Sequence, residues 1–143
     1  MPADVLGYLQ RALNSKASEY LVSPNQSHVY RGIKVPEQLA DAILGEVWRS
    51  SIKGVKKGSL QVHVTPGSSW TLEYEQAAYS SWGTFGKPVG LILRAPSHGN
   101  DFLDFRELYK LSAFRGVRGE QEVLSFDPVI HCDQVEWEKY GNG

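Results

Sequence analysis

Apolar positions in the first third of the chain repeat at helical spacing on either side of one β-prone segment. The first apolar stripe follows Asp4, a favourable N-cap, and predicts a helix over residues 4–20. Residues 28–33 are rich in β-prone side chains and predict a short strand. A second stripe runs from Leu39 to Trp48, and Pro36 before it predicts a helix with the proline in its first turn.

In the rest of the chain, apolar and polar positions mostly alternate, as in strands with one buried face. Such a strand is expected over Leu60–Val64, after a basic turn at residues 54–58. Thr71, with acidic residues behind it, predicts the N-cap of a helix over about 72–82. Further along we expect a strand over Val89–Ala95, a weak helix over Phe102–Leu111, a loop over Ser112–Gly119, strands over Glu122–Phe126 and Val129–Trp137, and a frayed tail from Tyr140.

This order, with helices early and strands later, favours an α+β fold with mainly antiparallel pairing. The 143 residues suit a single domain, 1–143, and a hydrophobic content of 41% is enough for a core. Cys132 is the one cysteine, so the core has no internal disulfide and depends on packing.

Charge and composition bear on whether the protein binds nucleic acid, a membrane or a metal. A net charge of −1 gives no reason to expect nucleic acid or an anionic membrane as a partner. The N-terminus lacks the pattern of a secretion signal, and no segment reaches the roughly 20 apolar residues of a membrane span. We therefore expect a soluble, cytoplasmic protein. The four histidines are scattered, and His131 beside Cys132 lacks the spacing and companions of a zinc site, so we expect no metal.

Two glutamates one residue apart, Glu120 and Glu122, lead into an apolar, strand-forming segment. Alternation along a strand puts both on the same side. In a cleft, such a pair can hold one carboxylate beside a developing cation and the other beside a nucleophile, which is the chemistry of glycosyl transfer. A solvated pair of surface charges is the alternative.

Arg31 lies inside the first predicted strand, and Gly32 behind it would allow a ligand to approach the backbone. Arginine is the natural bidentate partner of phosphate or carboxylate, and a salt bridge on an edge strand is the alternative. Ser69 could donate a hydrogen bond to a neighbouring glutamate and keep it ionised and oriented. Thr71, at the junction of strand and helix, could bind an anionic ligand or serve only as a helix cap.

In chain order, Tyr30–Gly32, Ser69–Thr71 and Glu120–Glu122 resemble the arginine, Ser-Thr-Ser and Glu-x-Glu motifs of one class of mono-ADP-ribosyltransferases, whose catalytic domains include those of toxins. The resemblance covers roughly residues 28–126 and includes Ala77–Tyr79. It implies two roughly perpendicular, mainly antiparallel sheets that form an NAD cleft, with helices packed on the N-terminal side.

The resemblance also implies a role for each residue. Arg31 would hold the pyrophosphate of NAD, and the backbone around Gly32 would bind the nicotinamide amide. Glu122 would bond the ribose 2′-hydroxyl and stabilise the oxocarbenium ion, while Ser69 holds Glu122. Glu120 would orient or deprotonate the nucleophile, and in this family a glutamate at that position goes with arginine of a target protein as the acceptor.

Three further residues complete the expected site. Tyr79 resembles the family's aromatic residue that stacks on nicotinamide, and an ordinary core tyrosine is the alternative. Phe114 and Arg115 lie in the stretch that the family uses to recognise its target, and a buried loop anchor is the alternative for Phe114. Transfer to a nucleobase, hydrolysis of NAD, and a non-catalytic protein-binding module on the same fold are the competing functions.

Overall fold

A computed structural model of the chain describes residues 27–65, 68–83, 86–97, 100, 102–104, 122–125 and 127–140. These residues form a seven-stranded sheet with the strand order β2-β7-β4-β1-β3-β6-β5, and every pairing in it is antiparallel. The expectation of an α+β fold with mainly antiparallel strands is therefore confirmed. The strands are β1 (His28–Val35), β2 (Lys53–His63), β3 (Ser68–Thr71), β4 (Val89–Pro96), β5 (Leu103–Asp104), β6 (Glu122–Ser125) and β7 (Val129–Lys139).

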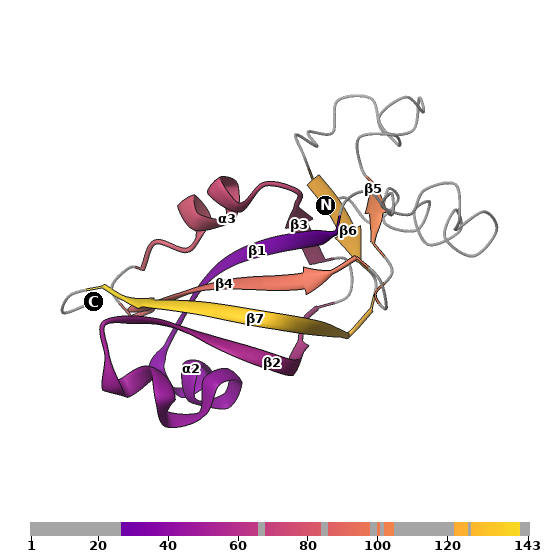
Figure 1. Cartoon of the computed structure of the whole chain (residues 1–143). Helices are drawn as coiled ribbons and strands as arrows, with labels where there is room; N and C mark the ends of the chain where they lie inside the picture. Colours follow the sequence, from indigo (N-terminus) through magenta and orange to yellow (C-terminus); the bar gives the residue numbers. More distant parts are fainter. Residues whose placement is uncertain are drawn as a thin grey trace.

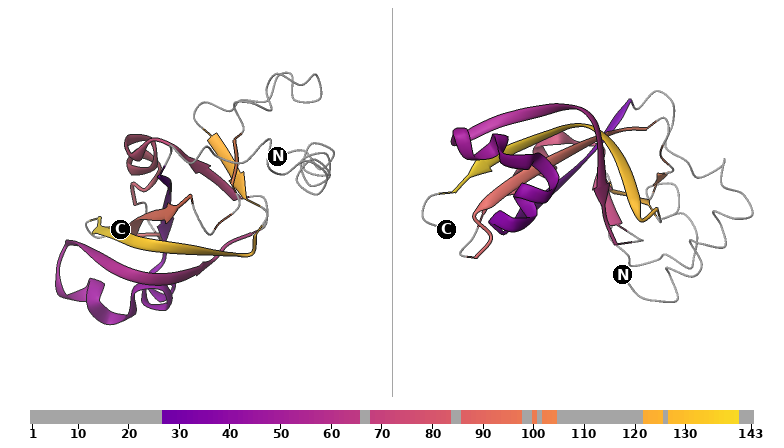
Figure 2. Two further views of the ribbon diagram at one scale, coloured as in Figure 1. Left: turned by 45° about the vertical axis from the view of Figure 1, so that its right-hand side comes forward. Right: turned by 90° about the horizontal axis from the view of Figure 1, so that it is seen from below.

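The long strands β2, β7, β4 and β1 lie side by side in one layer, with a helical segment on each face (Figure 1). On one face lies α2 (Glu37–Leu44), which continues directly into the 3₁₀ helix η1 (Gly45–Ser50). On the other face lies α3 (Tyr74–Ser80). The short strands β3, β6 and β5 extend the sheet beyond β1 at a steep inclination to the long strands (Figure 2).

The hydrophobic core fills the α2 face of the sheet. Strand alternation sends one set of side chains there, and the register of β1, β4 and β7 aligns Ile33 with Leu91 and Leu91 with Trp137. Leu44 and Trp48 cover this layer from α2 and η1 and are almost fully buried. The core continues toward β3 and β6 through residues that include Val29, Ala95, Phe102, Trp70 and Val123.

Helix α3 packs closely on the opposite face because two glycines leave room for its backbone. A Cβ atom on Gly32 would lie 1.7 Å from the carbonyl oxygen of Ala77, and one on Gly90 would lie 2.1 Å from that of Ser81. No real side chain tolerates such distances, so both positions require glycine. Gly32 was expected to let a ligand approach the backbone; in the structure its missing side chain leaves room for the backbone of α3.

The sequence pattern placed the strands around His28, Leu60, Val89, Glu122 and Val129 correctly and missed β3 and β5. The expected basic turn at residues 54–58 belongs to β2, which bends through a register shift between Lys57 and Leu60 and has Gly58 at φ 137°. The expected helix over 72–82 is shorter, and the segment before it is the strand β3. Leu103–Asp104 is a strand paired with β6 where a weak helix was expected.

The second predicted helix forms as α2. Pro36 was expected in its first turn but is the N-cap, and its backbone is extended, with φ −71° and ψ 164°. Tyr140, expected to fray, is fixed by a backbone hydrogen bond of 2.8 Å from its N–H to the Pro88 carbonyl. The predicted helix over 4–20 and the predicted loop over 112–119 lie outside the described residues. None of the helices in the described part of the chain has the length and apolar character needed to cross a membrane.

Candidate functional site

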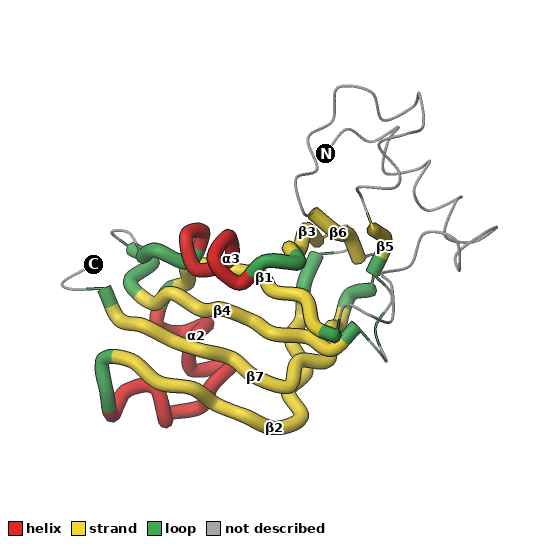
Figure 3. The backbone as a smooth tube through the Cα atoms, turned by 45° about the horizontal axis from the view of Figure 1, so that its top comes forward, coloured by secondary structure: helices red, strands yellow, loops and turns green. Residues whose placement is uncertain are grey.

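Three neighbouring strands, β1, β3 and β6, bring the arginine motif, the serine motif and Glu122 together at one end of the sheet (Figure 3). Tyr30 of β1 is the Cα partner of Thr71 in β3, and Thr71 is in turn the partner of Glu122 in β6. The two motif residues furthest apart in the sequence, Arg31 and Glu122, are therefore only two strands apart. Antiparallel neighbours lie about 4.8 Å apart, so one small ligand can span these strands.

Arg31 is a partly buried cation that is bonded to the neighbouring strand. Its Nη1 donates a hydrogen bond of 2.6 Å to the carbonyl oxygen of Ser69. The salt bridges of the described residues join Asp133 with His28 and Arg94, and Asp41 with Arg49, and none of them involves Arg31. Burial lowers the pKa of the Arg31 guanidinium because desolvation disfavours its charged form. An anion at this position would relieve that cost.

The register of β3 places two hydroxyl-bearing residues near Glu122. Thr71, and not Ser69, is opposite Glu122, because Ser69 pairs with Leu124. Ser69 is thus a diagonal neighbour of Glu122, two residues along the strand. The backbone carbonyl of Ser69 holds Arg31, so the serine motif and the arginine motif contact each other through the main chain.

Thr71 is buried, and its Oγ1 accepts a hydrogen bond of 3.1 Å from the Glu73 N–H. This local bond turns the chain from β3 toward α3. The N-cap position of α3 itself is Glu73, so the expectation that Thr71 is the N-cap was wrong by two residues. Thr71 remains the hydroxyl nearest in register to Glu122.

Ser68 and Trp70 are two buried residues of β3 whose contribution the sequence analysis missed. The Trp70 Nε1–H donates to the Ser68 Oγ at 2.9 Å, and the Trp70 ring packs edge-on against Phe102 with 5.4 Å between ring centroids. These contacts anchor β3 to the core. The sequence contains no pattern that identifies a serine as the hydrogen-bond partner of a buried tryptophan, so this contact could not be predicted.

Gly32 lies just beyond the point where the pairing of β1 with β3 ends. Within the described residues, β1 pairs with β4 along its whole length, whereas its pairing with β3 is limited to Tyr30 and Thr71. The edge of β1 beyond Tyr30 therefore has no strand partner on the β3 side among these residues. Helix α3 packs against this part of β1, with the Ala77 carbonyl at Gly32.

Tyr79 is on the surface of α3, with 72% of its area exposed. This finding excludes the alternative of an ordinary core tyrosine. Its ring lies 5.2 Å from that of Trp82, which is 61% exposed. Large exposed aromatic side chains that cluster in this way are typical of binding surfaces.

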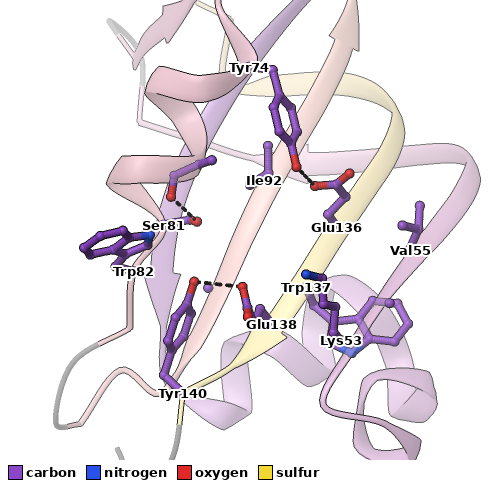
Figure 4. A pocket seen from close by; sticks show the side chains of 13 residues that line it. Lys53, Val55, Tyr74, Ser81, Trp82, Ile92, Glu136, Trp137, Glu138 and Tyr140 are labelled. Atoms are coloured by element: carbon purple, nitrogen blue, oxygen red, sulfur yellow. Dashed lines mark hydrogen bonds between the residues drawn. The ribbon is translucent and has the colours of Figure 1, made fainter.

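A cavity of about 310 Å³ lies between the end of α3 and β7, and we call it the α3–β7 cavity. Four aromatic residues and two carboxylates are among the residues that line it: Tyr74, Trp82, Trp137, Tyr140, Glu136 and Glu138 (Figure 4). The Tyr74 hydroxyl donates to Glu136 at 2.5 Å, and the Tyr140 hydroxyl donates to Glu138 at 3.1 Å. Neither Arg31 nor a residue of β3 lines this cavity.

Glu120, Phe114 and Arg115 lie outside the described residues. For Glu122 the structure describes the backbone, as the first residue of β6. Among the residues that the structure describes, no three His, Cys, Asp or Glu side chains gather to hold a metal ion. Comparisons of the chain with protein-family models, with curated proteins and with solved structures found no match.

Proposed function

We propose that the protein is an NAD-dependent mono-ADP-ribosyltransferase that transfers ADP-ribose to a protein side chain, most favourably arginine, and releases nicotinamide. The observation that carries the proposal is the adjacency of β1, β3 and β6, because β1 holds the arginine motif, β3 holds the serine motif and β6 begins at Glu122. One ligand can reach residues of all three strands, although they are about forty and fifty positions apart in the sequence.

The chemical character of Arg31 supports NAD as that ligand. A half-buried guanidinium that lacks a carboxylate partner among the described residues is suited to a pyrophosphate. The limited pairing between β1 and β3 supports a cleft beside Arg31 for the adjoining nicotinamide riboside. We propose that the inclined strands β3, β6 and β5 form the second wall of this cleft.

In the proposed reaction, the bond between the ribose C1′ and the nicotinamide nitrogen breaks, and its electron pair leaves with nicotinamide. Glu122 stabilises the oxocarbenium ion on C1′ and holds the ribose 2′-hydroxyl. A guanidino nitrogen of the acceptor then bonds to C1′, and its proton passes to Glu120. Thr71, opposite Glu122 in the register, replaces Ser69 as the favoured hydroxyl to orient that carboxylate.

The acceptor is identified by incubating the protein with a cell lysate and NAD labelled in its adenylate part. Transfer to arginine puts label into protein, in a linkage that survives mild acid and is lost to hydroxylamine. Label found in nucleic acid alone would show that the acceptor is a nucleobase and not a protein side chain. Free ADP-ribose alone would indicate an NAD glycohydrolase.

The role of Glu122 predicts that Glu122→Gln lowers the rate of nicotinamide release by at least ~10²-fold, since the amide cannot balance the charge on C1′. Release is measured on the purified protein with NAD in excess. Glu46→Gln, which neutralises an exposed carboxylate on η1, is the control and leaves the rate unchanged. Equal, measurable rates for Glu122→Gln and the native chain would refute the catalytic role of Glu122, whereas no release by the native chain would leave a non-catalytic binding module.

A further inference from the structure

The α3–β7 cavity combines features that suit a cation. Its volume, about 310 Å³, is at the lower end of the ~300–1,000 Å³ range of small-ligand pockets and fits one side chain better than a dinucleotide. Its walls are aromatic rings from α3 and the C-terminal segment, and its acidic groups come from β7. Ring faces and carboxylates both attract positive charge.

The two carboxylates are held in place but not neutralised. Each accepts one hydrogen bond from a tyrosine hydroxyl, whereas an ionised carboxylate can accept about four. Neither Glu136 nor Glu138 forms an ion pair with a described residue. Lys53 also lines the cavity and is opposite Glu138 in the register, so two carboxylates and one ammonium group leave the lining with a net charge of −1.

The wall formed by Tyr140 is rigid. The ring packs where Gly83 and Gly90 lack side chains, and a Cβ atom on either would lie 2.7 or 2.8 Å from the ring. The Tyr140 backbone is bonded to Pro88, and its hydroxyl is bonded to Glu138. A preformed wall lowers the entropy that a ligand must lose on binding.

Exposed apolar side chains lie on both sides of the cavity. Trp82 lies on the α3 side, with its ring tilted against that of Tyr79 and most of both rings exposed, and Val55 of β2 lies on the far side (Figure 4). Such apolar surroundings of an acidic centre match a basic side chain carried by a polypeptide with apolar neighbours.

We propose that the α3–β7 cavity is a docking site for an arginine side chain of a partner protein, stacked on Trp82 and bonded to Glu136 and Glu138. Arginine is favoured over lysine because its flat guanidinium stacks on aromatic rings and bonds two carboxylates at once. The inference concerns binding alone and does not depend on the transferase proposal. If both hold, the cavity selects target proteins at a place separate from the Arg31 site.

The test uses the full chain labelled with ¹⁵N and the peptide acetyl-Gly-Arg-Gly-amide. The peptide is expected to shift the Trp82 indole N–H resonance in a saturable way, while the matched peptide with neutral citrulline binds at least ~10-fold more weakly. Equal binding of the two peptides, or no saturable shift, would overturn the proposal. So would NAD that shifts the same resonance and displaces the arginine peptide.

Variants locate the binding. Glu136→Gln with Glu138→Gln is expected to weaken the peptide at least ~10-fold, whereas Glu37→Gln with Glu46→Gln, which removes two exposed charges from α2 and η1, leaves affinity unchanged. If the first pair does not fold, Trp82→Ala replaces it, since that ring is mostly exposed and its loss should also weaken the peptide by ~10-fold. Unchanged affinity in the folded variant contradicts the site.

Discussion

At the scale of single residues, Arg31 is the side chain whose environment is hardest to explain by stability alone. It is partly desolvated, and no described carboxylate pairs with it. Its hydrogen bond to the Ser69 carbonyl is charge-assisted and contributes roughly 1.5–3 kcal/mol. An anion bound beside the guanidinium would offset the remaining cost of holding this charge.

Arg31→Met should therefore separate stability from binding. We expect the free energy of unfolding in urea to change by less than about 1 kcal/mol, because loss of one hydrogen bond is offset by loss of a desolvated charge. The affinity for NAD, measured by calorimetry, should fall at least ~10-fold. Lys34→Met removes the same charge from an exposed neighbour on β1 and should leave NAD affinity unchanged. A large loss of stability with unaltered NAD binding would make Arg31 a structural residue.

Tyr74 reports the charge of the α3–β7 cavity. Its hydrogen bond to Glu136, together with partial burial, raises the pKa of Tyr74 from 10.0 to about 12. The unfolded chain then loses the phenol proton near pH 10 while the folded chain keeps it, so this contribution to stability is lost as the pH rises from 10 to about 12.

Glu136→Gln should lower the pKa of Tyr74 toward 10 and flatten the fall of stability over that alkaline range. Ultraviolet difference titration follows the phenol, and urea unfolding at several pH values follows the stability. Glu46→Gln serves as the comparison. An unchanged titration in Glu136→Gln would show that the phenol and the carboxylate do not interact.

At the scale of elements, β1 and α3 position the site, and their fit depends on Gly32. Gly32→Ala should destabilise the protein by roughly 1–3 kcal/mol, because the added methyl group meets the Ala77 backbone, which cannot move without displacing α3. Urea unfolding measures this loss, and Ser80→Ala, at an exposed position of the same helix, should change stability by less than about 0.5 kcal/mol.

The same variant also distinguishes the two roles considered for Gly32. If the glycine instead serves close approach of a ligand, Gly32→Ala would keep native stability and lose only NAD binding. That pattern would contradict the packing role.

Elements with long periodic patterns could be predicted from the sequence, and short ones could not. β4 and β7 carry runs of apolar side chains whose alternation identifies them, because one face of each is buried. β3 has four residues, and the serine and threonine in it also suit a helix cap, so local sequence favoured the wrong element. Its strand conformation comes from pairing with β6, whose residues are about fifty positions away.

At the scale of the whole molecule, the sequence could predict the fold class and the order of the motifs, but not which strands would be neighbours. The adjacency of β1, β3 and β6 depends on long-range pairing that no local pattern encodes. The α3–β7 cavity was missed for the same reason, since its residues come from α3, β7 and the C-terminal segment and form no motif in the sequence. Sites built across a sheet are therefore visible only once the strand order is known.

The proposal places NAD across β1, β3 and β6 and leaves the α3–β7 cavity for a different ligand. An experimental structure of the protein soaked or crystallised with NAD tests this claim most directly. We predict that the pyrophosphate contacts the Arg31 guanidinium and that the nicotinamide ribose lies beside Thr71 and Glu122. NAD bound in the α3–β7 cavity, or bound with Arg31 facing away from it, would contradict the account.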